Sequence, residues 1–231
     1  MGIARQVHRL RSFVRRDGRI TSGQSRAYAE LLPEVGLSIQ QGLINYDKVF
    51  GRAAPCFLEI GFGLGQSLLA AAAAHPDKNF IGVETHKPGI GALCVGIENK
   101  QLSNLRVFYA DVIDVLEKAI PDASLDGVQI FFPDPWQKRR HHPRRLVQPA
   151  FVKLVITKLK PGAAFHLATD WQDYAKHMLS VLSTEQQLTN VSGAGQFAAL
   201  RSPYRPIVSK FESRALREGR SVWDLQFTKR D

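Results

Sequence analysis

A stretch near the middle of the chain, from Val128 to Arg145, places a fixed carboxylate beside dense positive charge. Val128, Ile130, Phe131 and Phe132 at its start are apolar without alternation, which is typical of a central parallel strand that is buried on both faces. Pro133 and Pro135 then end the strand, because neither can donate a ladder hydrogen bond, and they stiffen the turn that holds Asp134. We therefore expect Asp134 at the carboxyl end of a strand, where open α/β sheets bind their ligands.

A run of cations and histidines follows this turn and contains no acidic residue. It comprises Lys138, Arg139, Arg140, His141, His142, Arg144 and Arg145. A charge run alone is usually a solvated loop, but this one comes directly after a carboxylate that is held between two prolines. Such a combination suits a site that holds a polyanion while chemistry takes place on one small part of it.

A second candidate site is the glycine-rich segment with Gly61, Gly63 and Gly65, which follows an expected strand over residues 56–60. Glycines at such a turn let the backbone approach a ligand, so the segment could serve a dinucleotide, S-adenosylmethionine or only a tight turn. The third glycine comes one residue earlier than in the dinucleotide pattern G-x-G-x-x-G. Glu59 would also repel a pyrophosphate. Both features favour S-adenosylmethionine, which has no phosphate and carries an ammonium and a sulfonium.

Acidic residues close two further expected strands. Glu84 ends the strand 79–84, where it could accept the ribose hydroxyls of a nucleoside, and Asp111 follows the strand 105–110, where it could meet the adenine amino group. Each could instead only cap the helix that follows it. Together with Glu59, they place acids at three successive strand ends, which favours the methyl donor over a nicotinamide cofactor.

The composition limits the partners of the protein. Lys+Arg 31 against Asp+Glu 21 in 231 residues gives a net charge of +10, which indicates a polyanionic partner. The longest wholly apolar run, residues 68–74, is too short to span a membrane, and the N-terminus has no hydrophobic segment of a secretory signal. Cys56 and Cys94 lie in apolar segments, as reduced thiols of a cytoplasmic protein do. No Cys/His spacing indicates a metal, and the chain could be a monomer or a homodimer.

The elements that must position these residues alternate along the chain. Strands are expected over residues 56–60, 79–84, 105–110, 125–132 and 163–169, with a helix after each, and a last strand over 221–227. This alternation predicts a doubly wound, mostly parallel α/β sheet with helices on both faces. Residues 1–26 carry seven arginines against one acid, and we expect them to form a mobile basic arm ahead of a single domain, 27–231. A helix is expected over 24–35, ending near Pro33.

With these residues in view, the sequence resembles the bacterial tRNA (guanine-N7-)-methyltransferases from about residue 13 to the C-terminus. The segments that carry the resemblance are SFVRRDGRIT, LEIGFGLGQSL, IGVETHKPGIG, FFPDPWQKRRHHPRRL, LATDW, SKFESR and VWDLQF. The P-D-P-W-x-K-x-R-H block is specific to the family, whereas many methyltransferases share the glycine loop. The resemblance implies a Rossmann-like class I methyltransferase fold with a seven-stranded sheet. It also implies S-adenosylmethionine as cofactor and tRNA as substrate, methylated at N7 of its variable-loop guanosine.

The resemblance also implies roles for single residues. The cofactor pocket would be lined by Glu59, Glu84, Asp111 and Asp134, and Asp134 would be the catalytic residue. The target guanosine would contact Lys138, Asp170, Ser209, Lys210, Phe211 and Glu212, and the RNA would touch residues 140–145. The chain departs from the family pattern at Ser209, where Thr is usual, at Asp111, which follows Tyr-Ala rather than Asn-Ala, and in ESRALREG, which lacks the usual Arg-Gly pair.

N7 of guanine has an exposed lone pair and no proton, so methyl transfer needs no base at N7. The protein has to align the reacting centres and stabilise charge, and we expect Asp134 to orient the guanine or to stabilise its positive ring. Two other functions compete. A small-molecule methyltransferase would leave the basic stretches unexplained, and a non-catalytic RNA-binding protein would have no use for the acids of a methyl-donor site.

Overall fold

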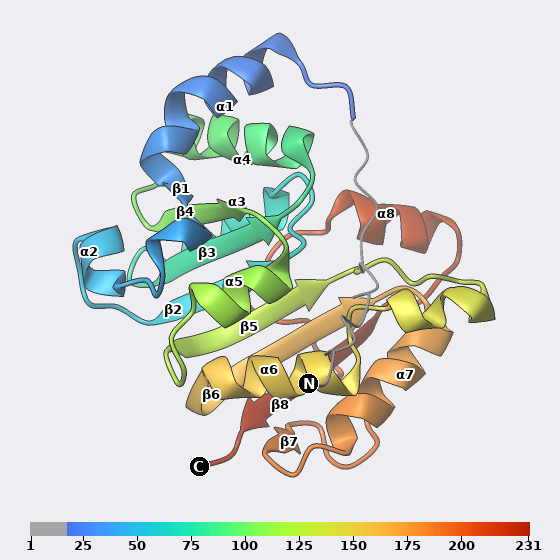
Figure 1. Cartoon of the computed structure of the whole chain (residues 1–231). Helices are drawn as coiled ribbons and strands as arrows, with labels where there is room; N and C mark the ends of the chain where they lie inside the picture. Colours follow the sequence, from blue (N-terminus) through green and yellow to red (C-terminus); the bar gives the residue numbers. More distant parts are fainter. Residues whose placement is uncertain (1–17) are drawn as a thin grey trace, which may run out of the picture.

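A mixed sheet runs through the centre of the computed structural model, which describes residues 18–231 except for the side chains at positions 210 and 211 (Figure 1). Within that range the sheet has eight strands in the order β1-β4-β3-β2-β5-β6-β8-β7. They are β1 (Gly36–Leu37), β2 (Cys56–Ile60), β3 (Asn79–Glu84), β4 (Leu105–Tyr109), β5 (Leu125–Phe131), β6 (Leu159–Thr169), β7 (Leu188–Asn190) and β8 (Trp223–Lys229). Only β8 runs against the other strands of this set. The expected doubly wound, mostly parallel sheet is confirmed, and the two-residue β1 raises the expected seven strands to eight.

Helices cover both faces of the sheet, as the alternation predicted. The helices are α1 (Ser22–Val35), α2 (Tyr46–Phe50), α3 (Gln66–Ala74), α4 (Lys87–Lys100), α5 (Val112–Lys118), α6 (Pro149–Lys158), α7 (Gln172–Ser183) and α8 (Lys210–Arg217), with the short 3₁₀ helices η1 (Ile39–Gln41) and η2 (Arg139–Arg144). Apolar residues of α1, α3 and α4 form one core with β3 and β4, and those of α5, α6 and α7 form a larger core on the opposite face. Among residues 18–231, no helix is long and apolar enough to cross a membrane.

The first helix begins earlier than expected. Thr21 caps α1 through a reciprocal pair of hydrogen bonds with Gln24, so the helix starts at Ser22 and then runs through Pro33 to Val35. It packs so closely on α4 that a Cβ at Gly91 would lie 2.8 Å from the Gln24 carbonyl. The expected boundary after residue 26 therefore falls inside a packed helix. The remainder of the expected basic arm, residues 1–17, lies outside the described part of the chain.

The carboxyl ends of β2, β3, β4 and β5 meet at one edge of the sheet. The chain connects β2 to β3 on one side and β5 to β6 on the other, so the order reverses between β2 and β5. Such a switch point opens a crevice at the carboxyl ends of the strands. The glycine loop after β2 and the proline-flanked turn after β5 lie on either side of it.

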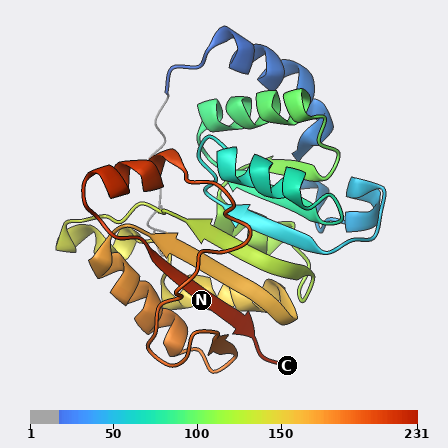
Figure 2. The same cartoon turned by 180° about the vertical axis from the view of Figure 1, so that it is seen from behind.

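An extended stretch, residues 198–209, crosses the sheet face formed by β5, β6 and β8 (Figure 2). Its contacts with the sheet are mostly polar: the Ala198 amide donates to the Asp224 carbonyl at 2.8 Å, and the Gln226 amide donates to the Leu200 carbonyl at 2.8 Å. Further along, the ring of Tyr204 packs on Phe57 with a centroid distance of 4.4 Å. We call this stretch the 198–209 segment. It leads directly into α8, which borders the switch point.

Candidate active site

A cavity of about 770 Å³ opens at the switch point between β2 and β5. Its walls are the glycine loop, the ends of β3 and β4, the turn after β5, and α8 with the residues that precede it. Of the residues that the sequence singled out, those lining it are Glu59, Gly61, Gly63, Gly65, Glu84, Asp134 and Ser209. The structure thus brings the two strongest sequence motifs, the glycine loop and the proline-flanked aspartate, into one site.

The glycine loop follows a path that favours glycine at all three positions. Gly61, Gly63 and Gly65 have φ angles of +71°, +59° and +75°, in the left-handed region. The loop also packs directly on α4, because a Cβ at Gly89 would lie 2.1 Å from the Gly63 carbonyl oxygen. Glu84 fixes the loop: its Oε2 accepts from the Gly63 amide at 2.9 Å and its Oε1 from the Thr85 amide at 2.6 Å.

Glu59 lies at the inner end of the cavity with little access to solvent. It is 3% exposed, and its Oε2 has no hydrogen-bond partner among the described residues. Burial raises the pKa of this carboxyl to about 8. A buried carboxyl group without a hydrogen-bond partner, placed beside the glycine loop, suits a cationic ligand and would repel a pyrophosphate. The residues present therefore fit the expected S-adenosylmethionine.

Asp111 behaves as a helix cap in this structure. Its Oδ1 accepts from the Ile113 amide at 2.8 Å, at the start of α5. Its neighbours Ala110 and Val112 line the cavity, whereas Asp111 is not among the lining residues. The alternative that the sequence left open for Asp111, capping, is observed, and the adenine contact stays a prediction.

Asp134 projects from a turn with two unusual backbone conformations. Phe132 and Trp136, on either side of it, have φ angles of +54° and +45°, which non-glycine residues adopt only when their surroundings enforce them. Arg145 provides part of that constraint, because its Nε donates to the Pro135 carbonyl at 2.9 Å. Within the described residues, Asp134 itself has no hydrogen-bond or ion-pair partner, and its carboxylate is exposed at the cavity. The carboxylate is therefore held in place and available to a ligand.

Arg145, which was expected to touch RNA, is buried within the protein. Its side chain is 2% exposed and bonds to Asp173 of α7 at 2.5 Å, with the guanidinium 4.8 Å from the Tyr174 ring centre. The Arg145 guanidinium holds the pKa of Asp173 below its usual range. His142 joins the same cluster, since its Nε2 lies 3.1 Å from an Arg145 nitrogen. Together these contacts fasten η2 and the turn to α7.

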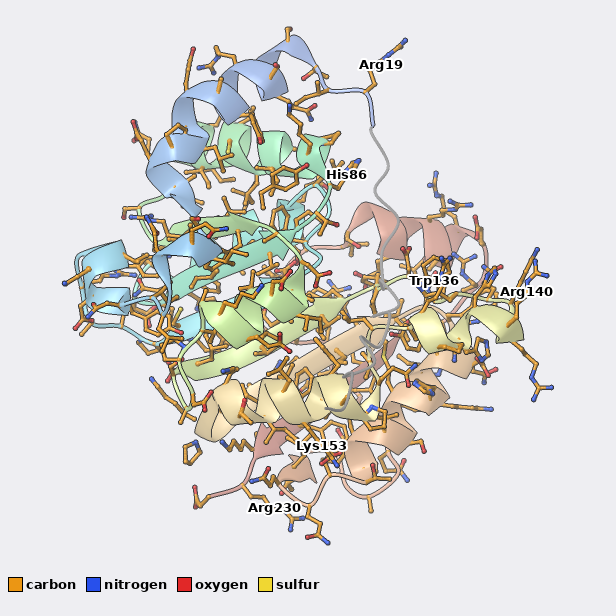
Figure 3. The ribbon with its side chains drawn as sticks, viewed as in Figure 1. Arg19, His86, Trp136, Arg140, Lys153 and Arg230 are labelled. Carbon is orange, nitrogen blue, oxygen red and sulfur yellow. The ribbon has the colours of Figure 1, made fainter. Side chains whose placement is uncertain are left out.

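The other cations of this run remain accessible. Lys138 and Arg140 are exposed, and Figure 3 shows Arg140 pointing away from the far end of η2. The guanidinium of Arg144 lies 4.7 Å from the ring centre of Trp136, against which His141 packs edge-on at 5.9 Å. Cations so close to an aromatic ring form a surface suited to phosphates and unstacked bases.

Of the residues near α8 that were expected to contact the guanosine, some line the cavity and others do not. Ser209 lines the cavity and caps α8, accepting from the Glu212 amide at 3.2 Å. Glu212 is buried, outside the lining, and accepts from Arg201 and from Arg205, the latter at 2.6 Å. Asp170, also outside the lining, accepts from Arg220 at 2.8 Å. Lys210 and Phe211 fall in the first turn of α8, and their side chains lie outside the described part.

Comparisons with known proteins establish the family. Residues 53–225 match the family model described as "Putative methyltransferase". The tRNA (guanine-N(7)-)-methyltransferase of Idiomarina loihiensis is 52% identical over 96% of this chain and 89% of its own length. That of Alcanivorax borkumensis is 51% identical over 97% and 93%. The chain belongs to the tRNA (guanine-N(7)-)-methyltransferase family.

Solved structures support the fold of this tRNA (guanine-N(7)-)-methyltransferase family member. The 16S rRNA methyltransferase KamB matches 80% of this chain and 93% of its own with a TM-score of 0.56 at 15% identity. The aminoglycoside resistance methyltransferase NpmB1 matches 84% and 94% with a TM-score of 0.54 at 15% identity. At such identities the likeness shows a shared Rossmann-like methyltransferase fold.

Sequence reasoning missed three arginines that line the cavity of this family member: Arg205, Arg214 and Arg217. Arg214 and Arg217 are three residues apart on α8, and this helical spacing was the signal that could have paired them on one face. Arg205 is fully buried, donating to Glu212 and to Asp224 at 2.6 Å each. Nothing in its surroundings, SPYRP, signals such burial. In the described part of the chain, no group of three or more His, Cys, Asp or Glu residues could hold a metal ion.

Proposed function

We propose that this protein transfers a methyl group from S-adenosylmethionine to N7 of the variable-loop guanosine of tRNA. The observation that carries the proposal is a single cavity in which the glycine loop, the buried Glu59 and the fixed Asp134 meet. The relatives' names give guanine N7 of tRNA as the site on which those proteins act. The choice of cofactor and of nucleotide goes beyond these names and rests on the arguments below.

The residues around the glycine loop support the cofactor. When bound, S-adenosylmethionine supplies an electrophilic methyl carbon whose bond to sulfur breaks as the new bond forms, leaving a neutral thioether. Glu59 offers a carboxylate to the positive charge of the amino acid part. Glu84 holds the loop backbone through the Gly63 amide at 2.9 Å and can accept ribose hydroxyls with its remaining lone pairs.

Asp134 supports guanine as the acceptor. N7 attacks with its own lone pair, so the protein needs no base to remove a proton there. A carboxylate accepts from the N1 and N2 donors of guanine, and its negative charge stabilises the cationic ring as methylation proceeds. Because the flanking prolines and Arg145 hold the turn, this charge needs little reorganisation during the reaction.

Exposed cations around the cavity support a polyanionic substrate. Figure 3 shows the exposed Arg19 and Arg140 on the side of the molecule toward which the parallel strands point. Arg214 and Arg217 lie on α8 at the cavity itself. Phosphate contacts from such side chains bind RNA without reading its sequence, and a guanine that reaches the cavity must be turned out of its stack.

Methyl transfer from labelled S-adenosylmethionine to unmodified tRNA, followed by nucleoside analysis, tests the proposal. We expect label in 7-methylguanosine, none with Asp134→Ala, and none in a tRNA whose variable-loop guanosine is replaced by adenosine. Label in another nucleoside would overturn the assignment of the target. Cofactor binding without any transfer to tRNA would favour a small-molecule substrate instead.

A further inference from the structure

Four polar side chains form a row across the sheet beneath the 198–209 segment. Residues of adjacent strands are paired in register: Glu59 of β2 with Gln129 of β5, Gln129 with His166 of β6, and His166 with Gln226 of β8. Because paired residues point to the same face of a sheet, the four side chains lie side by side on the face that the 198–209 segment covers. The row begins at the cofactor cavity, which Glu59 lines.

Gln226 and His166 have hydrogen-bond partners, whereas Gln129 and one oxygen of Glu59 have none among the described residues. The Gln226 amide donates to the Leu200 carbonyl at 2.8 Å, and His166 Nδ1 lies 2.8 Å from the Ser202 hydroxyl. Gln129 is 1% exposed, yet among residues 18–231 neither its Nε2 nor its Oε1 has a partner, and Glu59 Oε2 also lacks one. Buried polar atoms without hydrogen-bond partners destabilise a fold. The presence of the Gln129 amide beside the buried Oε2 of Glu59 therefore requires an explanation.

Among the described residues of the adjacent strands, Gln129 is the one polar side chain in register with Glu59. Its register partner on β3 is Gly82, and the space beside that glycine is filled by Phe62 and Leu68, each 2.7 Å from a Cβ placed there. The only cation of the 198–209 segment that lines the cavity, Arg205, is bound by two acids through its two terminal nitrogens, and its buried Nε has no partner among the described residues. Gln129 is thus the polar side chain beside Glu59 in the adjacent strands.

Charged and titratable groups on the other packed elements leave this conclusion unchanged. Burial lowers the pKa of His166 to about 4, so its ring is neutral at pH 7. Helix α3 contributes the neutral Ser67, whose hydroxyl is also buried and unpartnered. A carboxylate can persist in such surroundings only if hydrogen-bond donors reach it, and the Gln129 amide is the donor that the register brings alongside.

We propose that Gln129 is a positioning residue of the cofactor site, whose Nε2 donates to the buried Oε2 of Glu59 through one trapped water and so orients the carboxyl group toward a cationic ligand. The inference rests on the proposed function, because the cation is the ammonium of S-adenosylmethionine. A water between the two side chains would also satisfy the Gln129 Oε1, and buried waters typically have two to four such partners. Gln129 acts through Glu59 and does not touch the substrate.

The test is Gln129→Met, which keeps the length of the side chain and removes its amide. We expect its dissociation constants for S-adenosylmethionine and S-adenosylhomocysteine at pH 7 to rise about tenfold, the effect of one lost hydrogen bond to a charged group. Both probes carry the ammonium, so both should weaken. The KM for tRNA should stay within about twofold, because Gln129 does not touch the substrate.

Gln226→Met is the matched control, since it removes an amide from the same row at its far end. It should leave the affinity for both probes unchanged. If Gln129→Met bound both probes as tightly as the unaltered protein from pH 6 to pH 9, the inference would be wrong. An equal loss of affinity in Gln226→Met would also overturn it, because the effect would then be general to the row.

Gln129→Glu provides a test that does not depend on how the Met variant folds. A second carboxyl beside Glu59 disfavours the charged form of both, so the pH at which cofactor affinity reaches its plateau should rise by about one unit or more. An unmoved plateau contradicts the inference. If the unaltered protein bound neither probe and methylated no tRNA, the proposed function itself would fail, whereas normal binding and transfer with unaffected Gln129 variants would remove only this inference.

Discussion

At the scale of single residues, the site depends on two carboxyls in opposite environments. Glu59 is buried and has a raised pKa, whereas Asp134 is exposed on a constrained turn. The first is suited to respond to the charge of a ligand, because its own ionisation is costly until a cation approaches. The second is suited to present a permanent negative charge. Two predictions follow from this difference.

Cofactor affinity should depend on pH through Glu59. Burial raises the pKa of this carboxyl to about 8, so at pH 7 the free protein holds it mostly protonated, and a bound ammonium favours the ionised form. Binding below pH 8 therefore releases a proton, and affinity should fall by up to about tenfold for each pH unit below 8. Calorimetry at pH 7 in buffers of different ionisation enthalpy should show release of nearly one proton, and none for Glu59→Gln.

Asp134→Asn should impair turnover far more than cofactor binding. The substitution keeps the size of the side chain and removes the negative charge that stabilises the methylated ring. We expect kcat for tRNA methylation to fall by about a hundredfold, the scale of one lost electrostatic contact in a preorganised site, with cofactor affinity within about threefold. Single-turnover kinetics and cofactor titration separate the two quantities. A turnover number equal to that of the unaltered protein would exclude this role for Asp134.

At the scale of elements, η2 and the residue that ends it carry both exposed and buried cations. Arg145 at its end is buried against Tyr174 and bonds to Asp173 and to the Pro135 carbonyl. Arg140, within the same short helix, is exposed and is paired with no acidic residue in the described part of the chain. Because Arg145 is buried and Arg140 is exposed, we expect Arg145 to stabilise the turn and Arg140 to bind phosphate.

Arg145→Ala and Arg140→Ala should have separable effects. Removing Arg145 leaves a cavity and frees the turn that holds Asp134, so we expect a loss of about 2–3 kcal/mol in the free energy of unfolding together with a lower kcat. Removing Arg140 should leave the unfolding free energy within about 0.5 kcal/mol and raise only the KM for tRNA. Urea denaturation of both variants measures the unfolding free energy, and steady-state kinetics measures kcat and the KM for tRNA. Equal stability of the two variants would show that the Arg145 contacts do not hold the turn.

The same distinction shows what the sequence could predict. The limits of β2 and β5 were predicted to within a residue, because buried apolar residues dominate each strand and a glycine or proline follows it closely. β1 has two residues, too few to show any period. Glu212 was expected at the guanosine from the family resemblance, and in the structure it is buried in an ion pair with Arg205, seven positions away. Arg145 is likewise paired with an aspartate 28 positions away. Sequence patterns within a few residues cannot predict ion pairs between residues that only the folded chain brings together.

At the scale of the whole molecule, positive charge is exposed at both ends of the sheet, but only one end carries the cavity. Arg19 and Arg140 lie on the side toward which the parallel strands point, whereas Lys153, on α6, and Arg230 lie in the lower part of the view, away from both (Figure 3). A net charge of +10 attracts polyanions to the whole surface. Productive binding, in contrast, requires phosphates to lie where a base can enter the cavity, and Arg214 and Arg217 of α8 border that entrance.

The salt dependence of tRNA binding should therefore distinguish α8 from the opposite end. Each arginine that neutralises a phosphate contributes about one unit to the slope of log K against log[salt]. Arg214→Gln with Arg217→Gln should reduce the magnitude of that slope by about two units and leave cofactor affinity unchanged. Lys153→Gln with Arg230→Gln removes the same charge from the far end and should change the slope by less than about half a unit. Equal changes in the two pairs would mean that tRNA is held by net charge alone, and α8 would then have no special part in directing the base into the cavity.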